Sequence, residues 1–484
     1  MSRDRGSALA FRLPLRDLGS DNMRTTSRGT GDAMEWLLSQ LQERGDAEAM
    51  VGHWGRVTYA GLGDRATDWL TELDRLGVGA GESVAVVGNA SPAMVALVTA
   101  LAVRGAVAVP FAPADPPVEV RGIRIATAHA TRVIEFSGPD EWTVRTSAVP
   151  DGPRPGLLAA LAESGEAGLV LFSSGSTGES KAALLSLRHL FDGFRAPARP
   201  RRTLQFMALD HIGGINTLFR TLMGGGTVVT VPQRTPKHAC TAIERHRVQV
   251  LPTTPTFLNM LLLSGVHRDF DLSSLELITF GTEPMREITL AHAVKTFPHV
   301  QFKQTYGLTE TGILPTRSVS SESLRMDVGG RGFSTSVRNG VLWIKSPTSM
   351  LGYLNAPSPF DDDGWLDTGD AVEVAEDGSL RVLGRLSALM NVGGEKVSPA
   401  EVENVLLRAG NVRDAIVTGR PNPVTGEIVT AKVELIEQEE HRALNKRLRK
   451  FCAGQLPPHK IPAVITVSDV PLHGERFKRM GGTG

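Results

Sequence analysis

Short apolar runs alternate with helical patterns from about residue 82 to residue 306. The runs cover residues 83–87, 106–111, 169–173, 204–209, 227–231, 248–252 and 275–280. Runs of this length, separated by helix-like segments, predict a largely parallel sheet covered by helices. Ligands of such sheets bind beyond the carboxyl ends of the strands, so functional residues are expected just after the runs.

The pattern changes after about Gly312, where short alternating strands and turn signals begin. Residues 372–374 and 380–383 flank Asp377-Gly378, and this arrangement predicts a hairpin. The second half of the chain therefore begins with a small antiparallel β region.

A smaller α+β unit is predicted beyond Arg385. Ser398-Pro399-Ala400-Glu401 combines an N-cap serine, a proline at the first helical position and a glutamate three residues after the cap, which predicts a helix start. The unit is completed by strand-like residues 415–418, 429–435 and 463–467 and by a basic helix over about 439–452.

The expected architecture is α/β. A large N-terminal domain over 34–385 has layered parallel sheets and helices plus a small β-subdomain, and a small mobile α+β C-terminal domain follows over 386–484. Residues 1–33 are rich in Arg, Ser, Gly and Asp, which predicts a disordered tail or a mis-assigned start, with Met23 and Met34 as later starts. An Arg-rich targeting peptide is the alternative.

Composition narrows the functional classes. The 484 residues carry 52 Lys+Arg and 52 Asp+Glu with 5% aromatics, which argues against nucleic-acid binding and against membrane attachment by net charge. Cys240 and Cys452 are too few for a disulfide framework and fit a reducing cytoplasm. The longest apolar run, 92–113, is interrupted by Arg104-Gly105, which predicts a helix and then a strand rather than a membrane span. The oligomeric state stays open.

A Ser/Gly-rich stretch follows the apolar run that ends near residue 173. It reads Ser173-Ser174-Gly175-Ser176-Thr177-Gly178-Glu179-Ser180-Lys181. Glycines let backbone N–H groups turn toward an anion, hydroxyl groups add donors, and Lys181 supplies a positive charge. The stretch is a candidate triphosphate-binding loop, with a flexible surface linker as the alternative. It is not a Walker loop, because Gly178 is three residues from Lys181 and Ala182 follows.

Further motifs follow in order along the chain. They are Gln304-Thr305-Tyr306-Gly307-Leu308-Thr309-Glu310, Gly364-Trp365-Leu366-Asp367-Thr368-Gly369-Asp370, Gly384-Arg385, Asn391-Val392-Gly393-Gly394-Glu395-Lys396-Val397 and Lys478. With the Ser/Gly-rich stretch, they resemble the motifs of the adenylate-forming superfamily, which contains acyl-CoA synthetases, adenylation domains of nonribosomal peptide synthetases and beetle luciferases. The resemblance covers nearly the whole chain from about Met34.

The resemblance implies an ATP site and a Mg²⁺ site. Tyr306 would offer a flat face to adenine, Asp370 would accept hydrogen bonds from the ribose hydroxyls, and Glu310 would bind Mg²⁺, which prefers oxygen ligands. The implied ATP-binding residues are Ser173, Ser174, Gly175, Ser176, Thr177, Gly178, Lys181, Gly281, Thr282, Glu283, Thr305, Tyr306, Gly307, Asp370 and Arg385. The implied catalytic residues are Lys478, His211, Thr309 and Glu310. Without the other motifs, an ordinary strand-end turn with a solvated glutamate would be the favoured explanation of Tyr306 and Glu310.

A carboxylic acid is the implied substrate. Acyl-CoA synthetases of the superfamily usually carry a histidine at the position of His211. The implied acid-binding residues are His211, Ile212, Gly214, Ile215, Asn216, Thr253, Thr254, Gly281 and Leu308. Because small residues dominate this set, a medium-sized aliphatic or aromatic acid is expected.

The implied reaction has two steps. ATP and the acid give an acyl-adenylate and pyrophosphate, and the acyl group then passes to a thiol, either coenzyme A or the phosphopantetheine of a carrier protein acting in trans. The alternative acceptor is an amine, as in ligases resembling coronafacate ligase. Lys446, Arg447, Arg449 and Lys450 would meet the acceptor's phosphates or form an ordinary solvated helix face.

Three positions depart from the superfamily's usual pattern. Ser180 stands where a proline is usual, Phe477 stands where a glycine precedes the lysine, and Ser387 or Ala388 stands where the hinge residue is commonly Asp or Lys. Arg476 and Arg479 are therefore alternatives to Lys478 as the basic contact. A non-catalytic protein on a degenerate ligase fold is the more distant hypothesis.

Overall fold

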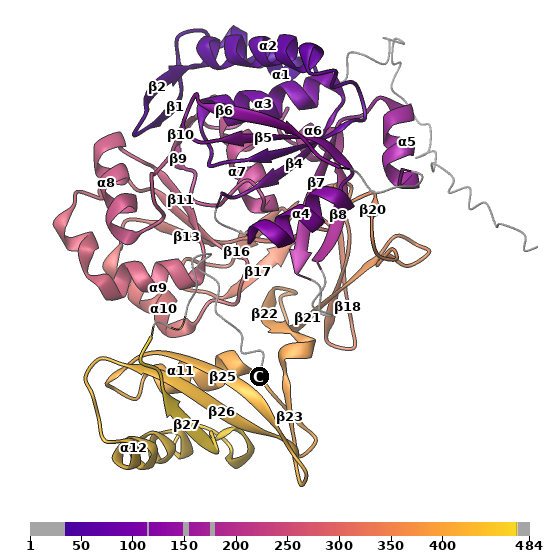
Figure 1. Cartoon of the computed structure of the whole chain (residues 1–484). Helices are drawn as coiled ribbons and strands as arrows, with labels where there is room; N and C mark the ends of the chain where they lie inside the picture. Colours follow the sequence, from indigo (N-terminus) through magenta and orange to yellow (C-terminus); the bar gives the residue numbers. More distant parts are fainter. Residues whose placement is uncertain (1–33, 114–115, 149–153, 175–179, 471, 473–484) are drawn as a thin grey trace, which may run out of the picture.

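The computed structural model describes residues 34–113, 116–148, 154–174, 180–470 and 472 (Figure 1). The expected tail over 1–33, the loop positions 175–179 and the segment that carries Lys478 lie outside these residues. Of Ser174 the structure describes the backbone only.

Two seven-stranded sheets form the large part of the molecule. The first has the order β20-β8-β7-β4-β3-β5-β6 and the second has the order β13-β12-β11-β9-β10-β1-β2. The strands of the first sheet are β3 (Ser83–Val87), β4 (Val107–Phe111), β5 (Ala130–Phe136), β6 (Trp142–Thr146), β7 (Gly168–Ser174), β8 (Ser180–Ser186) and β20 (Gly352–Tyr353). Those of the second are β1 (Glu48–Gly52), β2 (Gly55–Thr58), β9 (Arg202–Leu204), β10 (Thr227–Val229), β11 (Val250–Thr253), β12 (Leu277–Phe280) and β13 (Gln301–Gln304).

The centre of each sheet is parallel, as the alternating pattern predicts, and antiparallel strands occupy edges. β3, β4, β5 and β7 pair in parallel, while β6, β8 and β20 are antiparallel to their neighbours. In the second sheet β2 alone among the described pairings is antiparallel. The sequence pattern did not distinguish these edge strands from central ones.

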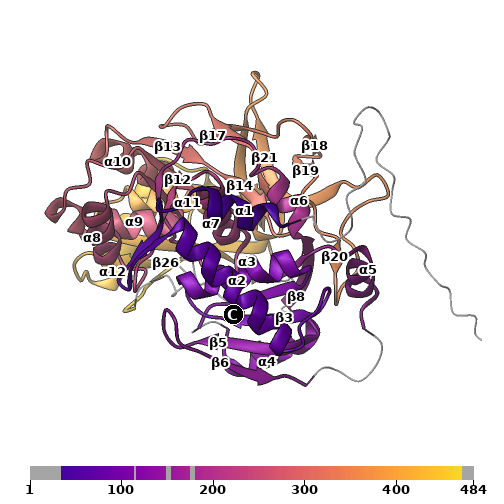
Figure 2. The ribbon, with the colours of Figure 1, turned by 90° about the horizontal axis from the view of Figure 1, so that it is seen from above.

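Helices cover both faces of the sheets (Figures 1 and 2). A core shared by the two sheets contains α1 (Trp36–Glu43), α2 (Tyr59–Arg75), α3 (Pro92–Arg104), α6 (Leu187–Asp192) and α7 (Ile212–Met223). The outer faces carry α4 (Val118–Thr127) and α5 (Gly156–Ser164) on one sheet and α8 (Pro236–His246), α9 (Pro255–Ser264) and α10 (Glu287–Thr296) on the other. α3 is buried on every side from Pro92 to Ala102, which explains why its sequence is apolar without periodicity.

One strand prediction is wrong. The apolar run over 204–209 is not a strand, because β9 ends at Leu204 and the chain then turns toward α7. The side chain of Gln205 holds this turn by donating to the carbonyl oxygens of Met207 and Gly214 at 2.8 and 3.1 Å. Phe206 and Leu209 are buried there, so the run is apolar because it crosses the core between two elements.

A six-stranded antiparallel sheet follows, in the order β16-β17-β22-β21-β19-β18. Its strands are β16 (Thr316–Ser318), β17 (Arg325–Val328), β18 (Ser334–Arg338), β19 (Val341–Lys345), β21 (Leu366–Val374) and β22 (Leu380–Arg385). The predicted hairpin is confirmed, since Val374 pairs with Leu380 and Gly378 has φ +82° in the turn.

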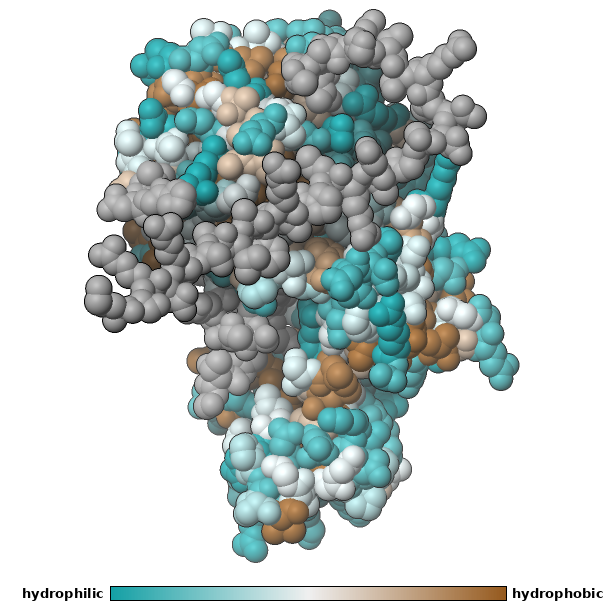
Figure 3. Space-filling model, turned by 90° about the vertical axis from the view of Figure 1, so that its right-hand side faces the viewer, coloured by the Kyte–Doolittle hydropathy of each residue, from teal (hydrophilic) through white to brown (hydrophobic). Residues whose placement is uncertain are grey.

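The C-terminal unit forms a separate lobe at the bottom of the molecule (Figures 1 and 3). Its hydrophobic core is drawn from residues 390–467. It contains β23 (Met390–Val392), β24 (Glu395–Val397), β25 (Val412–Asn422), β26 (Gly426–Leu435), β27 (Val464–Val467), α11 (Pro399–Leu407) and α12 (His441–Ala453). α11 begins at the predicted serine and proline, but Ser398 makes no side-chain cap. Glu401 pairs with Lys460 at 2.7 Å instead of closing a capping box.

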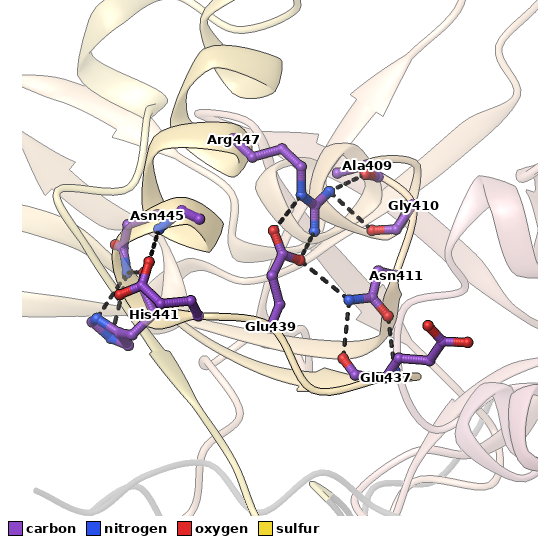
Figure 4. Close-up of polar contacts among 10 residues, drawn as sticks. Ala409, Gly410, Asn411, Glu437, Glu439, His441, Asn445 and Arg447 are labelled. Atoms are coloured by element: carbon purple, nitrogen blue, oxygen red, sulfur yellow. Dashed lines mark hydrogen bonds and ion pairs between the residues drawn. The ribbon is translucent and has the colours of Figure 1, made fainter.

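Arg447 of the basic helix α12 has a structural role. Its Nε and Nη2 donate to Glu439 at 2.9 and 2.7 Å, and its Nη1 donates to the carbonyl oxygens of Ala409 and Gly410 just after α11 (Figure 4). Asn411 joins the same cluster through Glu439 and Glu437. The guanidinium of Arg447 therefore ties α12 to the end of α11 and is not free for an acceptor's phosphates.

Candidate active site

A cavity of about 1710 Å³ lies over one face of the second sheet and extends past the carboxyl ends of its strands, against α7. Alternate residues of β12 face it, namely Leu277, Thr279 and, just beyond the strand, Gly281. Lys303 and Thr305 repeat this spacing on and just after the neighbouring strand β13. A period of two is what one face of a sheet presents, so a single sheet face forms the floor of the cavity.

The strands on either side of the Ser/Gly-rich stretch border this cavity. β7 and β8 are antiparallel, and Ser173 pairs with Lys181. Both residues line the cavity, and Lys181 Nζ lies 5.3 Å from the ring centroid of Tyr353. Residues up to 174 and residues from 180 onward belong to paired strands. These two flanks of the stretch are therefore not a free surface linker.

Ser180, which stands where a proline is usual, makes specific contacts. Its hydroxyl oxygen accepts from Nη2 and Nε of Arg124 on α4 at 2.7 and 3.2 Å. Asn355 donates to the Ser180 carbonyl oxygen and accepts from the Ala182 N–H, both at 2.9 Å. The base of the hairpin is thereby fixed from two sides.

Glu310 lies in a second hairpin, formed by β14 (Tyr306–Leu308) and β15 (Gly312–Leu314). Its Oε1 accepts from the Tyr353 hydroxyl at 2.5 Å, which leaves the carboxylate bordering the cavity beside Thr309. Burial and this contact raise the pKa of Tyr353, so the phenol stays protonated as a donor. The described residues contain no cluster of three or more His, Cys, Asp or Glu side chains that could bind a metal alone.

The donor set fits Mg²⁺ bound together with a polyphosphate. Mg²⁺ is commonly held by one or two carboxylates plus phosphate oxygens and water, so a single carboxylate such as Glu310 is sufficient on the protein side. The hairpin arm with Lys181 borders the same cavity, where such phosphates would lie.

Tyr306 and Asp370 are buried against one another rather than lining the cavity. The Tyr306 hydroxyl donates to Asp370 Oδ2 at 2.5 Å, and Arg385 Nε lies 3.1 Å from Asp370 Oδ1. Burial raises the pKa of Asp370, while the charge of Arg385 opposes this shift. Arg385 itself lines the cavity together with Thr368, so it links the buried carboxylate to the open space.

The adenine-loop residues differ in their surroundings. Gly281 packs so closely on Thr305 that an added Cβ would lie 2.5 Å from its Oγ1. Thr282 lines the cavity with φ +72°, whereas Glu283 turns away and accepts from the Thr256 N–H at 2.7 Å. Gly307, in the neighbouring hairpin, also lines the cavity.

Most of the expected acid-binding residues meet at one end of α7. His211, Ile212, Ile215 and Asn216 line the cavity from this helix, and Thr253 and Leu308 line it from other elements. Gly214 and Thr254 do not border it. An added Cβ on Gly214 would lie 1.9 Å from the Ala208 carbonyl oxygen, and the Thr254 hydroxyl caps α9 by accepting from the Phe257 N–H at 3.1 Å.

Sequence reasoning missed several charged residues of the cavity. Arg124, Asp210, Arg199, Arg201, Arg220 and Lys303 all line it. The strand period could have indicated Lys303, which lies two residues before Thr305, and the helix period could have indicated Arg220, four residues after Asn216. Lys478 lies outside the described residues, so the structure does not place it.

Comparison with known proteins gives a consistent result. The AMP-binding enzyme pattern matches residues 37–354, and the pattern of the AMP-binding enzyme C-terminal domain matches residues 401–476. A 4-coumarate–CoA ligase-like protein of Arabidopsis thaliana is 28% identical over 72% of this chain and 66% of its own length. The chain spans just under two thirds of the length of the first curated relatives it matches.

Two solved structures show the same fold. The amide bond synthetase McbA of Marinactinospora thermotolerans has a TM-score of 0.76 at 23% identity, covering 92% of this chain and 97% of its own. The anthranilate CoA ligase AuaEII, in complex with anthranoyl-AMP, has a TM-score of 0.78 at 21% identity, covering 93% and 95%. No helix among the described residues is long and apolar enough to cross a membrane.

Proposed function

The chain belongs to the AMP-binding enzyme family, and on this premise we propose that it activates a carboxylic acid with ATP, releasing pyrophosphate. The observation that carries the proposal is the meeting of the hairpin arm, Glu310 and Arg385 with the N-terminus of α7 in one cavity. The hairpin arm, Glu310 and Arg385 suit the phosphates and ribose of a nucleotide. The N-terminus of α7 suits an anionic acid.

The acid is expected to bind near His211. The first residues of α7 face the cavity, and a helix N-terminus carries a partial positive charge that favours a carboxylate. Thr253 and Asn216 add a hydroxyl and an amide to the lining of the same cavity. Held in this way, one carboxylate oxygen could face the α-phosphorus of ATP.

The proposed first step is an in-line displacement at the α-phosphorus of ATP. The carboxylate oxygen forms a bond to the α-phosphorus, the bond to the bridging oxygen of the β-phosphate breaks, and pyrophosphate leaves with that electron pair. Negative charge gathers on the phosphate oxygens, where the ammonium of Lys181 would stabilise it. Mg²⁺ held by Glu310 would neutralise further phosphate charge. We keep Lys478 as the proposed catalytic lysine, with Arg476 and Arg479 as alternatives.

A thiol is the proposed acceptor of the acyl group. The curated relatives in the comparison include several CoA ligases, which favours coenzyme A or a pantetheine-bearing carrier over an amine. Attack of the thiolate on the acyl carbon forms a thioester and expels AMP. We further propose that residues 34–385 and 386–484 act as two domains that rotate about the segment after Arg385 between the two steps.

The test is pyrophosphate release from Mg·ATP over a panel of aliphatic, aromatic and amino acids, with mass spectrometry for acyl-AMP. Coenzyme A and amines are then supplied in parallel. Acid-dependent pyrophosphate and a thioester product would support the proposal, whereas an amide product would replace the thiol with an amine. ATP binding with no turnover on any acid would refute the ligase function, and no ATP binding would favour a degenerate fold. Lys478→Ala retaining the full adenylation rate would remove that residue from the mechanism.

A further inference from the structure

Besides Lys181, whose ammonium lies 5.3 Å from the Tyr353 ring centroid, two cations of the cavity form neither an ion pair nor a hydrogen bond with a described residue. Lys303 on β13 and Arg220 on α7 both line it, and neither side chain forms an ion pair or hydrogen bond with any residue that the structure describes. The other basic pair of the lining, Arg199 and Arg201, is compensated by Glu276 at 3.2 and 3.6 Å.

Lys303 is half-buried, and its surroundings disfavour its charge. Burial lowers the pKa of Lys303, and the nearby charge of Arg220 lowers it further. A partly buried charge without a partner carries a desolvation cost, which falls mainly on Lys303 because Arg220 is exposed. A ligand that brings a negative charge between these two side chains would remove the cost.

No carboxylate of the cavity is available for this purpose. Glu310 bonds to Tyr353, and Asp367 accepts from the Gly369 N–H at 2.8 Å. Asp210 interacts with the backbone of Ala112 and with the charges of Arg234 and Arg124, and burial raises its pKa. The positive end of the cavity is therefore open to an anion from outside the protein.

Arg220 lies in the last turn of α7, away from the acid-binding end, and Lys303 is close enough to Arg220 for their charges to interact. Arg220 follows His211 by nine residues of helix, about 13 Å. The same cavity is lined by the hydroxyls of Thr203, Thr253 and Thr279 and by the amide of Asn216, so it offers polar contacts as well as apolar ones.

We propose that Lys303 and Arg220 form a subsite for a second anionic group of the acid, so that the preferred substrate is a dicarboxylic acid or a similarly anionic acid. One carboxylate would react near His211 while the distal carboxylate pairs with the two cations. The inference rests on the proposed function and narrows its substrate class, which the sequence left at a medium-sized aliphatic or aromatic acid.

The experiment compares α,ω-dicarboxylic acids with monocarboxylic acids of equal chain length in the pyrophosphate assay. The wild-type protein is expected to show the higher kcat/KM for diacids long enough to span about 13 Å, the helical separation of His211 and Arg220. Lys303→Met should lower the ratio of diacid to monoacid kcat/KM by about 10–100-fold, the loss expected for one charged hydrogen bond. Lys303→Arg should restore most of the ratio, and Arg220→Gln should lower it in the same direction.

Lys295→Met is the matched control, because Lys295 is exposed in the last turn of α10 and does not line the cavity. The ratio of diacid to monoacid kcat/KM for Lys295→Met should equal that of the wild type. A wild-type preference for monoacids, or an equal loss with both acids in Lys303→Met, would overturn the subsite while leaving the ligase function intact. Silence with every acid would instead overturn the proposed function, and the subsite with it. Thermal melting of each variant confirms that it is folded.

Discussion

The contact between the large and small units depends on Arg286, just before α10. Its Nη1 donates to Asp414 Oδ1 at 2.5 Å, its Nη2 donates to the Ala415 carbonyl oxygen at 2.8 Å, and its Nε lies 3.7 Å from Glu403 Oε2. The exposed fractions of the Arg286, Asp414 and Glu403 side chains are only 5%, 9% and 2%. Arg286→Ala would remove the guanidinium from two buried interface carboxylates, which would keep their hydrogen bonds from the N–H groups of Ala415 and Val417.

The size of the effect follows from this burial. Removing one partner of a buried ion pair costs about 3–5 kcal/mol, because the remaining charge is left uncompensated. Undocking of the small unit would relieve the cost by exposing Asp414 and Glu403 to water. Since about 1.4 kcal/mol is a factor of ten, the ratio of docked to undocked molecules should fall by about a hundredfold to several thousandfold.

Single-molecule energy transfer can measure docking directly. Leu263 on α9 and Val424 in the small unit are 46% and 89% exposed and can be replaced by cysteines for dye attachment. Cys240 and Cys452 are buried and should not react. The wild-type protein should give a narrow distance distribution, and Arg286→Ala a broad one shifted to longer distances.

Glu287→Ala is the control for this experiment. Glu287 adjoins Arg286, but its ion pair with Arg381 is exposed and lies within the large unit, so about 0–1 kcal/mol is expected and docking should not change. A distance distribution for Arg286→Ala that matches those of the control and the wild type would refute the reasoning. So would a loss of thermal stability with docking unchanged.

Three further predictions concern the site itself. Gly214→Ala should lower the free energy of unfolding by about 1–3 kcal/mol in chemical denaturation, because the added Cβ would meet the Ala208 carbonyl oxygen, whereas Gly213→Ala meets nothing within 4 Å and should cost nothing. Asp370→Asn should gain melting temperature relative to the wild type as pH rises above the ordinary Asp value of 3.8. Burial raises the pKa of Asp370 in the folded state above the ordinary value of 3.8. The contribution of Asp370 to the stability of the wild type is therefore present below pH 3.8 and is lost as pH rises through the folded-state pKa. Asn355→Ala should raise the KM for ATP severalfold and speed hydrogen exchange at the Ala182 amide, because both 2.9 Å hydrogen bonds at the base of the hairpin are lost.

Each of these predictions has a contradicting outcome. Equal denaturation midpoints for the two glycine variants would show that the first turn of α7 can shift at no cost. A melting-temperature difference between Asp370→Asn and the wild type that stays constant with pH would show that Asp370 titrates normally. Unchanged exchange at Ala182 would show that Asn355 does not hold the strand.

The sequence predicted elements whose signals are local. Buried strands such as β3 and β4 appear as unbroken apolar runs, and the hairpin at Gly378 depends only on adjacent turn residues. The strand prediction over 204–209 was wrong because a buried connecting segment has the same run of apolar residues as a buried strand.

The site was harder to predict, because its residues meet only in three dimensions. Gly214 and Thr254 adjoin cavity residues in sequence, yet the structure uses them for close packing and for helix capping. Lys303 and Arg220 are 83 residues apart in the chain, and nothing local indicates that both face one cavity. Whether two residues far apart in the chain face the same cavity depends on the order of the strands and on where α7 lies over the sheet.

The most direct test of the account is acid-dependent exchange of labelled pyrophosphate into ATP. Exchange requires reversible formation of an acyl-adenylate and needs no assumption about the acceptor. The account predicts exchange that depends on the acid and on Mg²⁺ and that falls sharply in Glu310→Gln, a near-isosteric change that removes the carboxylate charge. Tight ATP binding without exchange on any mono- or dicarboxylic acid, or full exchange in Glu310→Gln, would contradict it.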